Sequence, residues 1–136
     1  MNKNKFIKPL NSLYNEKGGI SKFLRVGKNI KKIEEIYFSE VKFKKIKCWK
    51  KHIENNLRIY VVSGKIRFVI YKNNKFYRID ITELSNKYLY IPKNTIFGFQ
   101  GLKKNNQLLC VLEIKHNDKE VINFDKIEYN YDNWIV

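Results

Sequence analysis

The feature that most constrains this chain is a series of short segments in which apolar and polar residues alternate. Within 65–71, Ile66, Phe68 and Ile70 share one face and the basic residues share the other. A period of two residues is that of a half-buried β-strand. Similar segments recur about every ten residues, a spacing typical of antiparallel sandwiches and barrels; they cover 37–43, 57–62, 76–81, 88–91 and 107–114. We therefore predict an all-β fold.

The size and composition indicate one compact domain over residues 1–136. The chain has 136 residues, of which 43% are hydrophobic and 30% charged, with only 6 Gly and 2 Pro. Two cysteines are too few for a secreted disulfide scaffold and suggest a reducing compartment. No run approaches the ~20 apolar residues of a membrane span, and no apolar region follows the basic start. We expect a cytoplasmic protein with no membrane partner.

The charge is strongly positive, with 28 Lys and Arg against 13 Asp and Glu, a formal net charge of +15. Such a field attracts polyanions, acidic lipids and phosphorylated small molecules. Only four residues are arginines, and Arg rather than Lys is favoured for base and bidentate phosphate recognition. The lysines are scattered along the sequence, which a compositional bias towards Lys, Asn and Ile also explains. We expect no nucleic-acid partner.

Several common catalytic motifs are absent from the sequence. Neither the GxxxxGK[ST] phosphate loop nor GxGxxG occurs, and two distant cysteines with two histidines cannot form a clustered zinc site. A nucleophilic pair of Cys110 with His52 is possible on paper. However, a cysteine in a strand is more typically a small apolar core residue.

Three groups of segments, taken in order, resemble a known family. They are 15–20 with 22–25, then 46–52 leading into 61–71, and finally 90–101 with 116–121 and 129–134. Together they resemble the dTDP-4-dehydrorhamnose 3,5-epimerase family, and the "Ser-Gly" hairpin at 63–64 is shared with the related sugar 3,4-ketoisomerases. The resemblance extends over nearly the whole chain, from about residue 15 to residue 134.

This resemblance implies a jelly-roll (cupin) antiparallel sandwich, forming a homodimer and working without a metal. It further implies a nucleotide-diphosphate sugar as partner: a 4-keto-6-deoxy sugar nucleotide that is epimerised or isomerised for surface-polysaccharide biosynthesis. Metal-binding cupins need a His-x-His pair with a later Glu and His. The corresponding places here hold Lys50, His52 and Phe97, which leave at most one good ligand.

Proton transfer beside a ketone needs a base, an acid and stabilisation of the enolate oxygen. In a strand, Lys50 and His52 share a face, and the family epimerases carry a histidine where this chain has Lys50. Three alternatives follow. Lys50 is itself a base; or it stays charged and holds an oxygen while His52 moves the proton; or catalysis is lost and a cupin remains that binds a nucleotide sugar or a protein partner without turnover.

The other candidates for substrate binding are Arg58, Arg67, Trp49, Phe97, Cys110 and Glu113. The two arginines could clamp the diphosphate or simply be solvated, and the two aromatic side chains could stack on the ligand or pack in the core. Cys110 lies on the strand where the epimerases carry a tyrosine acid, a role that Tyr60, Tyr88 or Tyr90 could take instead. Glu113 either pairs with a basic residue or orients His52.

Overall fold

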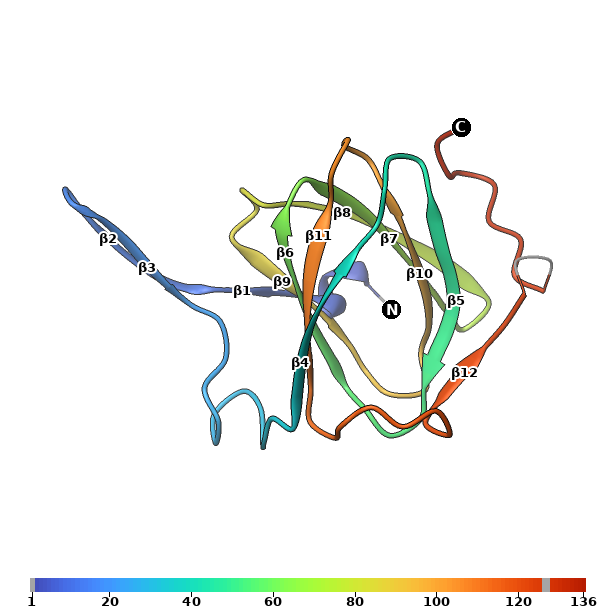
Figure 1. The fold of residues 1–136 in the computed structure, drawn as a ribbon, viewed down its shortest axis with the longest axis horizontal. Helices are drawn as coiled ribbons and strands as arrows, with labels where there is room; N and C mark the ends of the chain where they lie inside the picture. Colours follow the sequence, from blue (N-terminus) through green and yellow to red (C-terminus); the bar gives the residue numbers. More distant parts are fainter. Residues whose placement is uncertain (1, 126–127) are drawn as a thin grey trace.

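The computed structural model describes residues 2–125 and 128–136, and strands dominate it (Figure 1). The elements are η1 (Lys3–Phe6), β1 (Ile7–Pro9), β2 (Asn11–Asn15), β3 (Gly18–Lys22), β4 (Glu35–Glu40), β5 (Ile46–His52), β6 (Leu57–Ser63), β7 (Lys65–Lys72), β8 (Lys75–Thr82), β9 (Lys87–Ile91), β10 (Ile96–Gly101), β11 (Gln107–Leu112) and β12 (Val121–Asn123). No helix among the described residues has the length and apolar character needed to cross a membrane.

The strands form two five-stranded antiparallel sheets that face each other as a sandwich (Figure 1). One sheet has the order β1-β9-β6-β11-β4 and the other β12-β5-β10-β7-β8. From β4 to β11, the chain crosses from one sheet to the other at every step except the β7–β8 hairpin, whose two strands lie side by side in the second sheet. This is the jelly-roll arrangement of two Greek keys. The predicted all-β jelly-roll fold is confirmed. The β2–β3 hairpin, which stands out from the sandwich in Figure 1, was not among the predicted strands.

The alternation in the sequence decides which side chains enter the core. Ile66, Phe68 and Ile70 of β7 are fully buried, whereas Lys65 and Arg67 are only partly covered. Their partners across the sandwich include Leu108 and the other inward residues of β11. Burying each such side chain contributes roughly 1.5–3 kcal/mol, so this layer accounts for much of the stability of the fold.

A polar side chain joins three segments at one end of the sandwich. Asn106 is fully buried, and its Oδ1 accepts hydrogen bonds from the backbone N–H groups of Lys65 and Lys103, at 2.9 and 3.1 Å. Its Nδ2 donates to the carbonyls of Val41 and Lys103. Gly64 turns tightly against this amide with φ 81°, where a Cβ would lie 2.4 Å from Oδ1. The loops after β4 and β10 are thereby fixed beside the β6–β7 turn.

Candidate active site

A pocket of about 360 Å³ opens where the edge of one sheet faces the other. Four of its residues come from β4 and two from β5, and the remaining two come from the segment after β11 and from β12. The lining residues are Glu35, Tyr37, Phe38, Ser39, Lys50, His52, His116 and Val121. The pocket therefore contains both residues that the sequence analysis proposed as catalytic.

A bulge in β5 sets which of its side chains face this pocket. Opposite β10, Phe97 pairs with Lys50 but Phe99 pairs with Lys47, so two residues of β5 face the single Gly98. A Cβ on Gly98 would lie 2.4 Å from the Cβ of Cys48, which explains the glycine. Directly paired residues share a face, so Lys50 lies on the face of Phe97, and His52 follows two residues later.

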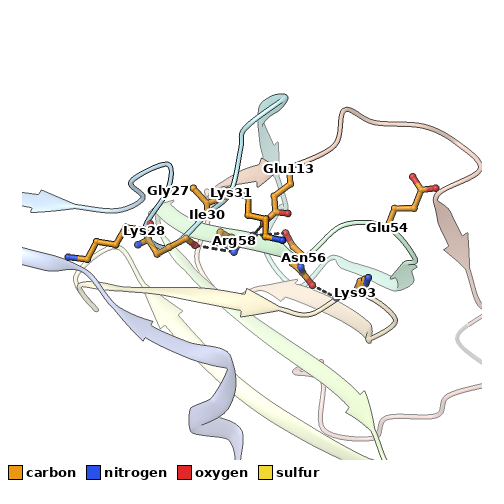
Figure 2. A pocket seen from close by; sticks show the side chains of 10 residues that line it. Gly27, Lys28, Ile30, Lys31, Glu54, Asn56, Arg58, Lys93 and Glu113 are labelled. Atoms are coloured by element: carbon orange, nitrogen blue, oxygen red, sulfur yellow. Dashed lines mark hydrogen bonds and ion pairs between the residues drawn. The ribbon is translucent and has the colours of Figure 1, made fainter.

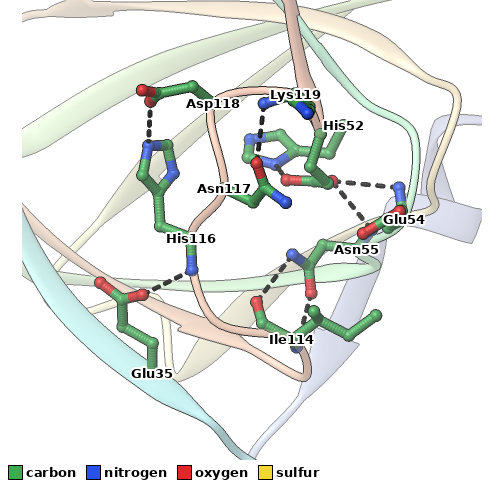
Figure 3. A network of polar contacts seen from close by, with 10 residues as sticks. Glu35, His52, Glu54, Asn55, Ile114, His116, Asn117, Asp118 and Lys119 are labelled. Carbon is green, nitrogen blue, oxygen red and sulfur yellow. Dashed lines mark hydrogen bonds and ion pairs between the residues drawn. The ribbon is translucent and has the colours of Figure 1, made fainter.

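The best-defined polar contact of the site joins His52 to Glu120. Both side chains are buried, with 6% and 1% of their surface exposed, and Nδ1 lies 2.8 Å from Glu120 Oε2. The other carboxylate oxygen accepts hydrogen bonds from the backbone N–H groups of Glu54 and Asn55, at 3.1 and 3.0 Å (Figure 3). Asn55 in turn bonds the backbone of Ile114 in both directions. The carboxylate is thus held on three sides.

These contacts decide the protonation of the pair. Burial raises the pKa of Glu120, but hydrogen bonds from His52 and from the two backbone N–H groups outweigh it and bring that pKa below its ordinary value. Burial lowers the pKa of His52, and the ammonium of Lys50 lowers it further, against the opposite effect of Glu120. His52 is therefore neutral near pH 7 and donates Nδ1–H to an ionised Glu120. Its Nε2 lone pair remains available as a base.

Tyr37 supplies a hydroxyl to the same pocket from the opposite wall. It is half-buried on β4 and pairs in register with Cys110 of β11. Burial raises the pKa of Tyr37 above its ordinary value of 10.0, so the phenol stays protonated and can donate. Burial likewise raises the pKa of the Cys110 thiol to about 12. Cys110 is thus an unionised core residue rather than a nucleophile.

Lys50 lines the pocket, and Lys47 brings a second positive charge close to it through the lining residue Ser39. Lys50 is exposed, and Lys47 donates from Nζ to Ser39 Oγ at 3.3 Å, across the gap between β5 and β4. A lysine acts as a base at neutral pH when burial removes its hydration, and that condition is not met at Lys50. The arrangement favours the second alternative of the sequence analysis, in which Lys50 stays charged and His52 moves the proton.

Two predicted residues, Arg58 and Glu113, lie in a different pocket. Figure 2 shows them pairing with each other, Nη1 to Oε1 at 2.5 Å, while Arg58 Nη2 donates to the carbonyl of Asn29. The guanidinium also lies over the ring of Tyr90. Glu113 thus forms an ion pair with a basic residue, one of its two expected roles, and the carboxylate that orients His52 is Glu120.

The remaining predicted residues have mainly packing partners. Phe97 is buried in the core, and its ring stacks at 24° to that of His52 with 6.2 Å between the centroids. Trp49 lies on the opposite face of the second sheet, where its Nε1 donates to the carbonyl of Tyr129 at 2.9 Å. Arg67 forms a two-point ion pair with Asp80 and donates to the carbonyl of Asn133. Trp49 and Arg67 thus fix the C-terminal segment and do not line the His52 pocket.

Sequence reasoning missed three residues of the site. Tyr37 was treated only as part of a strand, and the tyrosines named instead lie elsewhere: Tyr60 and Tyr88 pack against Phe23. Glu120 is 68 residues from His52, and no local pattern connects them. His116, which was considered only as part of the 116–121 motif, is exposed and also lines the pocket, and its backbone N–H donates to Glu35.

A metal centre has no evident place among these residues. Within 2–125 and 128–136, no three His, Cys, Asp or Glu side chains gather closely enough to hold a metal ion. Within the site, Nδ1 of His52 is already hydrogen-bonded to the Glu120 carboxylate.

Comparison with known proteins adds evidence on the fold. No family model and no curated protein sequence matches the chain. A dTDP sugar isomerase from Desulfovibrio desulfuricans G20 is 23% identical, with a TM-score of 0.75 over 88% of this chain and 82% of that one. A dTDP-4-dehydrorhamnose 3,5-epimerase from Elizabethkingia anophelis NUHP1 is 12% identical, with a TM-score of 0.78 over 96% and 80%.

A third match is a sugar 3,4-ketoisomerase from Thermoanaerobacterium thermosaccharolyticum, solved in complex with TDP. It is 11% identical, with a TM-score of 0.76 over 89% of this chain and 88% of that one. Likeness at such low identity establishes architecture. The chain therefore has the cupin jelly-roll fold shared by these sugar-nucleotide isomerases and epimerases.

Proposed function

We propose that the protein is a sugar-nucleotide isomerase of the 3,4-ketoisomerase type, acting on a 4-keto-6-deoxy sugar linked to a nucleoside diphosphate. The observation that carries the proposal is the neutral His52, held by buried Glu120 with Nε2 left free at the wall of a pocket. A base of lowered pKa in a partly enclosed pocket suits proton abstraction beside a ketone.

The reaction balances without a co-reactant. His52 Nε2 takes the proton from C3, which the ketone at C4 acidifies, and the electron pair of that bond forms the C3–C4 double bond of an enediolate. Tyr37 gives its proton to O4 and recovers one from O3. The protonated His52 then returns its proton to C4, so the ketone moves to C3. One imidazole serves both carbons, which favours keto transfer over an epimerisation that needs a second group on the opposite face.

The charges beside the pocket suit a diphosphate. Lys50 in the lining and Lys47 close to it supply two ammonium groups, and Lys binds phosphate as a point charge. Two structures of the same fold support this substrate class by analogy: the Thermoanaerobacterium enzyme was solved with TDP, and a histidine-to-asparagine variant of it with TDP-4-keto-6-deoxyglucose. We place the reaction in the cytoplasm, upstream of enzymes that use modified sugars for surface polysaccharides.

The direct test is keto transfer by the purified protein in deuterated water. With TDP-4-keto-6-deoxyglucose, we expect NMR to show the ketone moving from C4 to C3. Deuterium enters at C4 in those turnovers in which the Nε2 proton exchanges with solvent before it is returned, and the original C3 proton is found at C4 in the others. His52→Asn should lower the rate at least ~100-fold, the usual contribution of a general base. The Asn amide can still donate to Glu120, so the melting temperature should change little. A melting temperature that rises with TDP-, GDP- or CDP-linked keto sugars, with no movement of the ketone and no deuterium exchange, would instead identify a binding protein without turnover.

A second prediction concerns Lys50, for which Lys51 provides a matched control. Lys51 follows it on β5 but lies on the other face, with its ammonium 5.7 Å from the centre of the Phe124 ring. Lys50→Gln should raise the KM for the sugar nucleotide up to about fivefold, since an exposed ion pair contributes up to ~1 kcal/mol. Lys51→Gln removes the same charge and should leave KM unchanged. Equal effects of both variants would contradict a specific role for Lys50.

We further propose that two copies form a homodimer through the outer face of the first sheet. Phe38 and Ile36 of β4 are 62% and 52% exposed there. Leu109 of β11 pairs with Phe38 on one side and with Tyr60 of β6 on the other, so these three side chains form a row across the sheet. The β2–β3 hairpin also exposes apolar side chains, namely Leu13, Tyr14 and Ile20. A two-stranded hairpin is marginally stable alone, and a contiguous apolar face of this kind marks an interface.

The dimer is tested by light scattering after size exclusion. We expect a mass of twice 16.5 kDa. Phe38→Ser combined with Ile36→Ser should give the monomer mass, because it places hydroxyls at the centre of the proposed interface. Leu84→Ser, which alters an 87% exposed side chain in the turn before β9, is the control and should remain dimeric. A wild-type mass of 16.5 kDa would refute the dimer.

A further inference from the structure

Lysines that are scattered in the sequence meet at one end of the sandwich. Lys42, Lys44 and Lys45 lie in the loop after β4, and Lys103 and Lys104 lie in the loop after β10. Backbone hydrogen bonds join these loops: Lys44 N–H donates to the carbonyl of Gly101, and Gly101 N–H to that of Lys45, at 2.9 and 3.2 Å. We call this group, together with Lys65, the basic end.

The start of β7 belongs to the same surface. Leu102 N–H donates to the carbonyl of Lys65 at 2.9 Å, and the Asn106 amide bonds the backbone of Lys65 and Lys103. The backbone positions of the basic end are therefore fixed by the fold. Apart from the partly covered Lys65, its lysines are exposed.

Few acids neutralise these charges. Glu40 pairs with Lys42 at 3.7 Å. Glu83 lies beside the β6–β7 turn, where its backbone N–H donates to the carbonyl of Gly64. At the opposite end, by contrast, cations and acids are interleaved among the described residues. Examples are Lys32 with Glu34, Arg58 with Glu113, and His116 with Asp118. A uniform excess of lysine does not produce this asymmetry, because it arises from where the acids are placed.

An aromatic side chain stands among the lysines. Phe43 is 47% exposed in the loop after β4, next to Lys44, whose left-handed backbone (φ 65°) makes the turn. The Lys44 ammonium lies 5.3 Å from the centre of the ring. This combination suits the surface of a bilayer, because the ammonium groups can contact anionic headgroups while the ring enters the apolar layer beneath them.

We propose that the basic end docks on the surface of an anionic lipid bilayer. Clusters of four to eight basic residues give such binding, and lysine suffices because the surface presents charge without fixed hydrogen-bond geometry. A nucleic acid fits less well, since the basic end has no arginine and only one ring for stacking. The sequence analysis expected no membrane partner because no segment could span a bilayer, but surface docking needs no span.

Docking in this way leaves the candidate active site free. The basic end includes the loop that joins the end of β4 to the start of β5, whereas Glu35 begins β4 and His52 ends β5. The proposed catalytic residues thus lie towards the opposite ends of the same strands. An enzyme held at a membrane by its basic end would still exchange substrate with solution.

Vesicle sedimentation with the full chain tests the proposal. We expect binding to vesicles of phosphatidylcholine and phosphatidylglycerol in equal parts, and none to phosphatidylcholine alone. Raising the salt from about 0.1 M to about 1 M should abolish binding, because the screening length shortens from ~10 to ~3 Å. The triple variant Lys45→Gln, Lys103→Gln, Lys104→Gln should bind about 100-fold more weakly, at roughly fivefold per lysine.

The matched control is Lys28→Gln, Lys31→Gln, Lys75→Gln, which removes the same charge from exposed positions outside the basic end. It should retain most of the binding, and equal melting temperatures verify that both triple variants fold. Three results would overturn the proposal: no binding to the anionic vesicles, equal losses in the two triple variants, or tighter binding of a single-stranded oligonucleotide that the first triple variant loses. The last result would assign the basic end to nucleic acid.

Discussion

The contact on which the site depends is the buried pair of His52 and Glu120. A carboxylate that is 1% exposed would be strongly unfavourable without partners. Here an imidazole and two backbone N–H groups compensate it. The same bonds connect the end of β5 to the start of β12, and they fix the ring nitrogen that faces the pocket. The Glu120 carboxylate therefore both holds β5 against β12 and orients the His52 ring for the proposed proton transfer.

The position next to this pair explains how the chain departs from the family that its sequence resembles. Lysine replaces the first histidine of the motif, at position 50, and the second histidine is kept. The replacement leaves His52 as the imidazole that β5 supplies to the pocket, and it adds the charge of an exposed Lys50 to the lining. That charge also helps to lower the pKa of His52. The change therefore favours a single base that serves two carbons.

Much of the fold could be predicted because local patterns determine it. The alternation in 65–71 reflects burial of one face, and β7 follows it from Lys65 to Lys72. The site was predictable only in part, because period two places Lys50 and His52 together but says nothing about Glu120 or Tyr37. Arg58 and Arg67 face away from the pocket, since each lies on the outer face of its sheet, where Glu113 and Asp80 pair with them. The gathering of lysines at one end likewise depends on which loops the topology makes neighbours.

The proposed chemistry requires His52 to be a neutral base whose proton is held on Nδ1 by the contact with Glu120. Nitrogen-15 NMR of the labelled imidazole over a pH series measures this directly. We predict a ring with its proton on Nδ1 and an unprotonated Nε2 at pH 7, titrating below the ordinary pKa of 6.5. A proton on Nε2 at pH 7, or a titration midpoint above 6.5, would contradict the assignment of His52 as the base.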